Sequence, residues 1–168
     1  MVEENRYAPP RAPVSDTQPG QTRQELAGRG ERLGAFIIDV ILLSIVTMPY
    51  MWTSNLAERA MSDQLEANDT LTLLLVTLIG YLVLNGYLLH KSGQTIGKRL
   101  IGIRIVSATD GQLVSLGKLF GARYVPIQLA GLVPFIGNFL WIADALFIFR
   151  EDRRCLHDLI AGTRVVKA

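Results

Sequence analysis

Two long apolar stretches constrain this chain more than any other feature of its sequence. Residues 33–53 contain a single charged residue, Asp39, and residues 70–89 contain none. A helix needs about 20 mostly apolar residues to cross the hydrocarbon core of a bilayer, and both stretches reach that length. A soluble domain would instead show shorter apolar faces at a helical or strand period. The sequence therefore predicts a membrane protein with helices over about 31–53 and 70–90.

A third apolar region, residues 124–149, carries only Asp144 and contains a turn-like GLVPFIG segment. Two complete crossings would need about 40 residues. We therefore expect a helical hairpin over 115–149 that barely crosses the bilayer or is partly re-entrant, with a kink at Pro126. The predicted fold class is an all-α membrane protein with about four transmembrane or partly re-entrant helices.

The distribution of charge predicts the orientation. Acidic residues dominate between the first two apolar stretches, whereas Lys and Arg dominate before residue 33, between residues 91 and 118, and after residue 149. Basic loops stay in the cytoplasm, so we expect both termini inside, residues 58–69 outside, and a bacterial inner-membrane location. The single cysteine, Cys155, allows no intrachain disulfide and suits a reducing compartment.

The remaining segments divide the chain into a tail and one membrane domain. Residues 1–28 are rich in Pro, Gln and charge, so we expect a disordered cytoplasmic tail, followed by a membrane domain over 29–168. Residues 54–69 can form a short amphipathic helix. The alternating isoleucines after residue 100 and the Asp110–Gly111 pair predict a cytoplasmic β-hairpin, and the β-branched run at the C-terminus could pair with its edge.

The candidate ion pocket comprises four charged residues, Arg32, Asp39, Asp144 and Asp158. Arg32 and Asp39 are seven residues apart, so they share a helix face, and Asp144 should lie at nearly the depth of Asp39. Two carboxylates at one depth could share a proton, with Asn85 nearby, which suits cation or proton exchange. The alternative is that the charges neutralise one another, as pairs of Arg32 with Asp158 or of Asp39 with Lys98.

Two other motifs do not predict catalysis. The GQTIGKRL segment lacks the spacing and the Ser/Thr of a phosphate-binding loop. Its basic residues fit membrane topology and anionic lipid at the cytoplasmic face; the motif comprises Gly93, Gly97, Lys98, Arg99 and Arg104. His157 and Asp158 could belong to an interfacial helix. We expect no enzymatic activity, cofactor, metal or nucleic-acid partner.

Three blocks resemble the RDD family of bacterial membrane proteins: RGERLGAFIIDVILL, GQTIGKRLIGIRIVSATDGQLVSLGKLFGARY and RRCLHDLIAGTRVV. The resemblance covers residues 29–166. It implies that Arg32 and Asp39 are the family's arginine and first aspartate, and that the second aspartate is Asp158, with Asp144 as the competing position. The family's molecular role is largely unknown, although a few members are linked to cation/proton antiport.

These observations lead to two hypotheses about function. The first is a multi-pass membrane protein that transports a small ion or solute, with cation/proton exchange as the specific form. The alternative is a non-transporting adaptor or assembly factor that organises a partner protein or anionic lipid. A homo-oligomer or a membrane-protein partner is compatible with either hypothesis.

Overall fold

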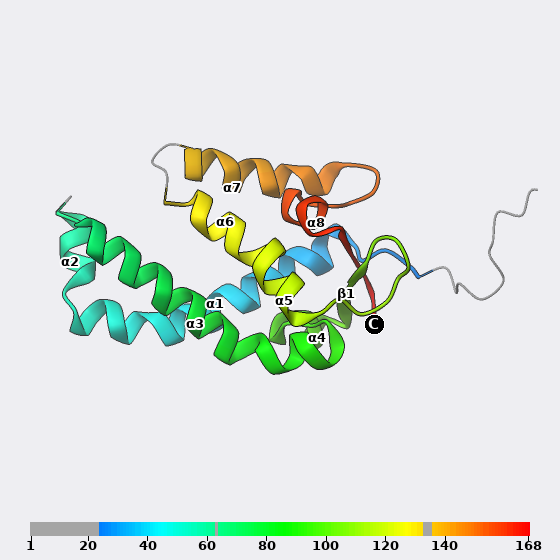
Figure 1. The fold of residues 1–168 in the computed structure, drawn as a ribbon, viewed down its shortest axis with the longest axis horizontal. Coiled ribbons are helices and arrows are strands. Elements are labelled where there is room, and N and C mark those ends of the chain that lie inside the picture. The colour runs from blue at the N-terminus through cyan, green and yellow to red at the C-terminus, as the bar shows by residue number, and fades with distance from the viewer. Residues whose placement is uncertain (1–23, 63, 133–135) are drawn as a thin grey trace, which may run out of the picture.

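The computed structural model describes residues 24–62, 64–132 and 136–168 (Figure 1). The chain is mainly helical, with one small sheet at the end of the molecule where α1 begins and α3 ends; we call this the sheet end. The elements in chain order are α1 (Arg29–Thr53), α2 (Leu56–Met61), α3 (Ala67–Ser92), α4 (Ile96–Ile101), β1 (Ile103–Ser107), α5 (Leu116–Lys118), η1 (Leu119–Tyr124), α6 (Val125–Ala130), α7 (Ile136–Leu146), η2 (Phe147–Phe149), α8 (Leu156–Ala161) and β2 (Thr163–Lys167).

Two helices, α1 and α3, are long and apolar enough to cross a membrane. They run side by side in opposite directions and are joined by the short helix α2 (Figure 1), as the sequence predicted. Their large apolar side chains point mostly outward, so that Ile45 is 63% exposed and Val83 is 77% exposed. In water such a surface would be strongly unfavourable, whereas hydrocarbon solvates it. The fold is therefore that of a membrane protein.

The third apolar region forms two short, irregular arms. The first passes through α5, the π-helical segment η1 and α6, and the second comprises α7 and η2. Pro126 lies in the first turn of α6, directly after η1. Because proline has no N–H to donate, regular α-helical bonding is interrupted there. In Figure 1 both arms extend less far toward α2 than α1 and α3 do.

The sheet corrects one prediction. β1 does not form a local hairpin; it pairs antiparallel with β2, from Ile103 opposite Lys167 to Ser107 opposite Thr163. The Asp110–Gly111 turn does form, with Ser107 N donating to Gln112 O at 2.9 Å, but no strand follows it before α5. The C-terminal strand β2 is the partner of β1 instead, because this pairing buries Val165 and Val166 almost completely.

Residues 25–27, which we expected to belong to a disordered tail, contribute to this sheet. Ala27 N donates to Val165 O at 3.1 Å, and Lys167 N donates to Glu25 O at 3.0 Å. Leu26 forms a β-bridge with Val166. This segment covers an edge of β2 that would otherwise expose unpaired backbone groups. The rest of the predicted tail, residues 1–23, lies outside the described residues.

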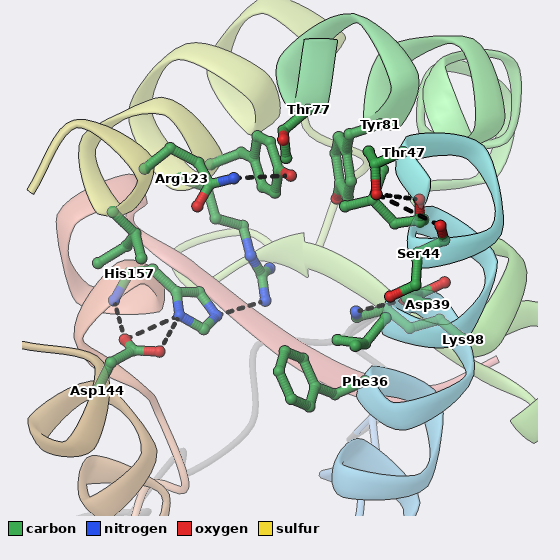
Figure 2. Close-up of a pocket in the computed structure, with 15 residues that line it drawn as sticks. Phe36, Asp39, Ser44, Thr47, Thr77, Tyr81, Lys98, Arg123, Asp144 and His157 are labelled. Atoms are coloured by element: carbon green, nitrogen blue, oxygen red, sulfur yellow. Dashed lines mark hydrogen bonds and ion pairs between the residues drawn. The ribbon is translucent and has the colours of Figure 1, made fainter. Parts of the chain in front are cut away.

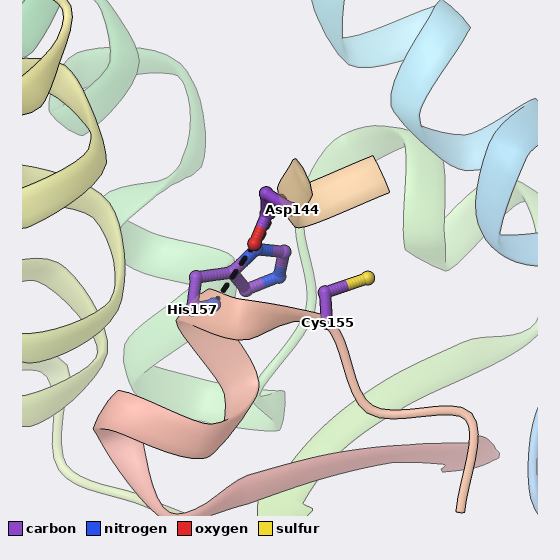
Figure 3. A group of neighbouring side chains, drawn as sticks. All are labelled: Asp144, Cys155 and His157. Atoms are coloured by element: carbon purple, nitrogen blue, oxygen red, sulfur yellow. Dashed lines mark hydrogen bonds and ion pairs between the residues drawn. The ribbon is translucent and has the colours of Figure 1, made fainter. Parts of the chain in front are cut away.

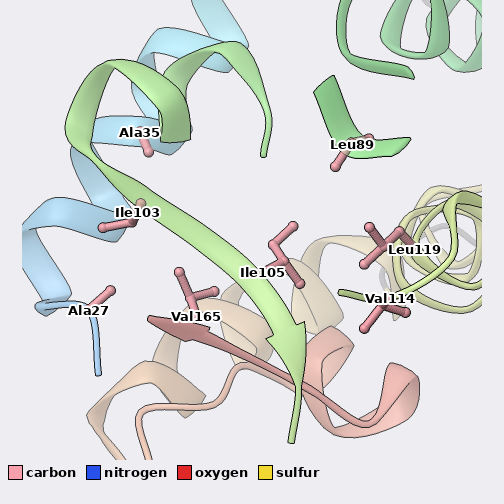
Figure 4. Packing of buried hydrophobic residues seen from close by; sticks show 8 residues of the cluster. All are labelled: Ala27, Ala35, Leu89, Ile103, Ile105, Val114, Leu119 and Val165. Carbon is pink, nitrogen blue, oxygen red and sulfur yellow. The ribbon is translucent and has the colours of Figure 1, made fainter. Parts of the chain in front are cut away.

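The buried apolar core lies at the sheet end rather than along the long helices (Figure 4). Ile103 and Ile105 of β1 and Val165 of β2 meet Ala35 of α1 and Leu89 of α3. The core therefore fixes the start of α1 and the end of α3 against the sheet. These parts of the two helices carry all of their charged residues except Asp69, which lies at the start of α3.

Candidate functional site

A cavity of about 430 Å³ opens above this core, between the helices (Figure 2). Its walls come from α1, α3, α4, η1, α6, α7 and α8. Toward the sheet end it is lined by charged or titratable side chains, namely Asp39, Lys98, Arg123, Asp144 and His157. Further polar side chains contribute hydroxyl or amide groups to its walls, namely Ser44, Thr47, Thr77, Tyr81, Tyr124 and Gln128.

Asp39 is held by the start of α4. Its Oδ1 accepts a hydrogen bond from Gly97 N at 2.8 Å, and its Oδ2 accepts one from Thr95 Oγ1 at 2.5 Å. The Lys98 ammonium lies 3.9 Å from Oδ2. A carboxylate near a helix N-terminus is stabilised by the free N–H groups and by the helix dipole. These contacts explain why an otherwise apolar helix tolerates an aspartate.

Two other side chains complete the N-terminus of α4. Asn85 of α3 accepts from Ile96 N at 2.9 Å, and Thr95 accepts from Lys98 N at 3.2 Å. Gly97 must be glycine because a Cβ atom there would lie 2.1 Å from the carbonyl oxygen of Ala35. The close approach places α4 directly on α1 and brings Lys98 to the cavity.

Asp158 is fully buried and is the centre of a second cluster beside the cavity. Its carboxylate contacts the Arg32 guanidinium and lies 2.9 Å from Arg123 NH2. Thr163 Oγ1 donates to it at 3.1 Å and Cys155 N at 3.2 Å. Burial alone would raise the pKa of Asp158, but the positive charge of Arg123 and the hydrogen-bonded guanidinium of Arg32 help to hold the pKa below its usual value. Asp158 is therefore ionised and joins α1, η1 and α8.

His157 connects this cluster to Asp144 of α7. Its Nδ1 lies 2.8 Å from both carboxylate oxygens, and its backbone N donates to Asp144 at 2.9 Å. Its Nε2 lies 3.0 Å from Arg123 NH2. Since a guanidinium can only donate, Nε2 must accept, and Nδ1 carries the proton. Burial, followed by the charge of Arg123, lowers the pKa of His157, which agrees with a neutral ring.

The structure brings the predicted pocket residues together differently from the expectation. Asp39 and Asp144 do line one cavity, but each has its own hydrogen-bond donors, so the prediction of a shared proton is not supported. Arg32 does not contribute to the cavity wall; it pairs with Asp158. Both alternative pairs, Arg32 with Asp158 and Asp39 with Lys98, are present.

The basic motif is also divided. Of its residues, only Lys98 lines the cavity. Gly93 ends α3 with a positive φ of 66°, and a Cβ atom there would lie 2.5 Å from Ile105 O. Arg99 is exposed on α4, and Arg104 lies on β1 opposite Val166.

Sequence reasoning missed the role of Arg123. Its side chain is only 10% exposed and reaches both Asp158 and His157. No local pattern marks it, because its partners are more than 30 residues away in the chain. The contact of Arg32 with Asp158 favours Asp158 over Asp144 as the second family aspartate, although that assignment stays a prediction.

Asp144, Cys155 and His157 form a group whose potential ligand atoms lie within 4.8 Å of one another (Figure 3). Such a group resembles a metal site only by composition. The His157 ring nitrogen facing Asp144 is already hydrogen-bonded to it. The sulfur of Cys155 receives Arg32 NH2 at 3.4 Å, and burial raises the pKa of the thiol. Neighbouring guanidinium groups make this position unfavourable for a divalent cation.

The fold and the cavity define a class: a membrane protein with two long apolar helices and a charged pocket at their sheet end. The chain belongs to the RDD family, whose model matches residues 26–162. It is 37% identical over 144 residues to the uncharacterized protein YckC of Bacillus subtilis, which covers 84% of this chain and 85% of that protein. It is 36% identical over 92 residues to an uncharacterized protein of Haemophilus influenzae, with 53% and 56% of the two chains covered. No solved structure matches the chain.

Proposed function

We propose that this chain is a multi-pass inner-membrane protein that binds a small ion or solute in the cavity and carries it across the bilayer. The observation that supports this function is the cavity itself, which combines charged residues near the sheet end with hydroxyl groups along α1 and α3. Ionisable groups within membrane proteins are costly and commonly mark ion or solute pathways. The short α6 and α7 arms would then form a partly re-entrant hairpin beside the cavity.

The specific form that we propose is cation/proton exchange at Asp39. Its two carboxylate oxygens are not equivalent. Oδ1 accepts the backbone N–H of Gly97 at 2.8 Å. Oδ2 accepts the Thr95 hydroxyl at 2.5 Å, and its contact with the Lys98 ammonium is long, at 3.9 Å. A cation could replace Lys98 beside Oδ2 while Gly97 N continues to hold Oδ1. Ser44 and Thr47, further along the same wall, offer additional oxygen atoms.

The test is cation-dependent proton flux in proteoliposomes that contain the purified full chain. Asp39→Asn keeps an acceptor for Gly97 N but removes the negative charge, so we expect a folded protein that has lost flux. Asp110→Asn is the matched control, because Asp110 lies in an exposed turn away from the cavity; its flux should equal that of the parent. A folded parent that is silent under Na⁺, K⁺, Li⁺ and pH gradients would exclude cation exchange.

One observation favours a second candidate, a membrane adaptor that holds anionic lipid or a partner, including a second copy of the chain. α4 presents Leu100, which is 69% exposed, next to the exposed Arg99. An apolar residue beside a cationic one suits a lipid headgroup region. On this hypothesis, Arg99→Gln should reduce the anionic phospholipid that remains bound through purification, while Asp39→Asn should leave it unchanged.

A further inference from the structure

The charged groups that line the cavity are equal in number, with two carboxylates and two cations beside a neutral His157, but they differ in their hydrogen bonding. Asp144 is bonded to His157, and Asp39 is bonded to Gly97 and Thr95. Both carboxylates therefore already have donors from the protein. The positive groups differ, because Lys98 and Arg123 extend into the cavity from opposite walls (Figure 2).

Lys98 has unused hydrogen-bonding capacity. Among the described residues, its ammonium makes one ionic contact, the 3.9 Å approach to Asp39, which is longer than a hydrogen bond. An ammonium has three N–H donors. Burial, followed by the charge of Arg123, lowers the pKa of Lys98, which agrees with two cations that line one cavity.

Arg123 also retains a donor. Its NH2 group is engaged by Asp158 and by His157, and its NH1 group donates to Thr163 Oγ1 at 3.4 Å. Its Nε has no acceptor among the residues that the structure describes. Tyr124, the residue after Arg123, also lines the cavity. Its hydroxyl oxygen accepts a hydrogen bond from Gln128 at 3.1 Å, which leaves the phenolic proton free for donation.

We infer that the cavity holds a small oxyanion, a carboxylate or phosphate group, between the Lys98 ammonium and the Arg123 guanidinium. Such a group would accept hydrogen bonds from the unused N–H donors and from the Tyr124 hydroxyl. It would also lie between the two positive charges and reduce their repulsion. Charge-assisted hydrogen bonds to carboxylate or phosphate are among the strongest that proteins make. The volume of about 430 Å³ is within the range of small-molecule sites.

The oxyanion can come from a free solute or from a phospholipid headgroup, because both present the same acceptor oxygens. Phe36 and Ile127 line the cavity beside the charged groups and would tolerate an acyl chain as well as an apolar solute. The inference goes beyond cation exchange and does not depend on it. An equilibrium binding measurement can therefore succeed in a protein that shows no flux.

The experiment is isothermal titration of the full chain in phosphatidylcholine nanodiscs with inorganic phosphate and, separately, with acetate. We expect saturable binding that weakens about tenfold or more in Lys98→Met, since a charged hydrogen bond is lost, and is retained in Lys98→Arg. Lys91→Met is the matched control, because Lys91 is exposed near Tyr87 and outside the cavity. Tyr124→Phe should weaken binding severalfold and provides a second test if Lys98→Met does not fold.

A second arm uses phosphatidylglycerol nanodiscs. Loss of phosphate binding in these discs, together with phosphatidylglycerol that co-purifies with the parent but not with Lys98→Met, would assign the oxyanion to a lipid headgroup. Binding that is equal in both lipids would assign it to a free solute. Absence of saturable phosphate and acetate binding by the folded parent in phosphatidylcholine, without lipid retention in the second arm, would overturn the inference. Equal binding by folded Lys98→Met would overturn it as well.

Discussion

At the scale of single residues, the two charges that the sequence places on one face of α1 serve different partners. Asp39 accepts the N–H of Gly97 at the start of α4, whereas Arg32 meets Asp158 of α8. Both are structural contacts as well as candidate functional ones. A variant of either residue must therefore be checked for folding before its function is interpreted.

Arg32 and Asp158 should be energetically coupled. Removing one partner of a buried ion pair typically costs 3 to 5 kcal/mol because the other charge is left uncompensated. We expect Arg32→Met and Asp158→Asn each to destabilise the protein, and the double variant to lose less than the sum by about 1 to 3 kcal/mol. The measurement is a double-mutant cycle of unfolding free energies in detergent.

The control for this cycle is Arg32→Met combined with Asp39→Asn. We expected these two residues to act in one network, but the structure gives them different partners, so their losses should now add. Additive losses for Arg32 and Asp158 would show that their contact does not contribute in solution.

At the scale of elements, short polar links connect the helices to the sheet end. α4 is fixed by residues of α1 and α3, and α7 is fixed by the bond of Asp144 with His157 of α8. None of the described residues of the buried core belongs to α7. The attachment of α7 is therefore expected to be sensitive to the protonation of His157.

Stability should decrease as the pH falls below about 6.5, the ordinary pKa of histidine. The folded protein lowers the pKa of His157, so the unfolded chain binds a proton first as the pH falls, and unfolding becomes more favourable. One titrating group limits the slope to about 1.4 kcal/mol per pH unit. Thermal unfolding in detergent between pH 7.5 and 5 measures this slope.

His157→Asn provides the comparison for this experiment, because its amide can still donate to Asp144 but does not titrate in that range. The variant should unfold at a lower temperature at pH 7.5 and should lose less stability on acidification than the parent. Asp158, whose pKa is lowered from 3.8, affects stability only at more acidic pH. Equal slopes for parent and variant would exclude His157 as the titrating group.

At the scale of the whole molecule, the buried core and most of the polar contacts described above lie at the sheet end. α1 and α3 extend from it with exposed apolar surfaces. Both described ends of the chain are near the sheet (Figure 1), since residues 25–27 pair with β2. If α1 and α3 cross the bilayer, both of these ends lie on the same side.

The excess of Lys and Arg at the sheet end predicts that this side is cytoplasmic. In a Cys155→Ser background, a cysteine introduced by Ser62→Cys should react with an impermeant thiol reagent added outside intact cells. A cysteine introduced by Asp110→Cys should react only after the membrane is permeabilised. The reverse labelling pattern would invert the proposed topology and move the charged part of the cavity to the outer face.

The sequence by itself determined the features that depend on local composition. The lengths of α1 and α3, the short helix α2 and the interruption at Pro126 follow from runs of apolar residues and from the missing N–H of proline. The family membership followed in the same way from contiguous motifs. Each of these features is encoded by neighbouring residues, so no knowledge of the fold was needed.

The tertiary structure decided which charges meet. Sequence spacing grouped Arg32 with Asp39, but the fold separates them and gives each a partner more than 50 residues away. It also replaced the expected hairpin with the pairing of β1 and β2, and it placed Arg123 against Asp158. The physical reason is that a buried charge selects its partner by distance in space, and that distance is set by the packing of α4, α8 and the sheet against the two long helices.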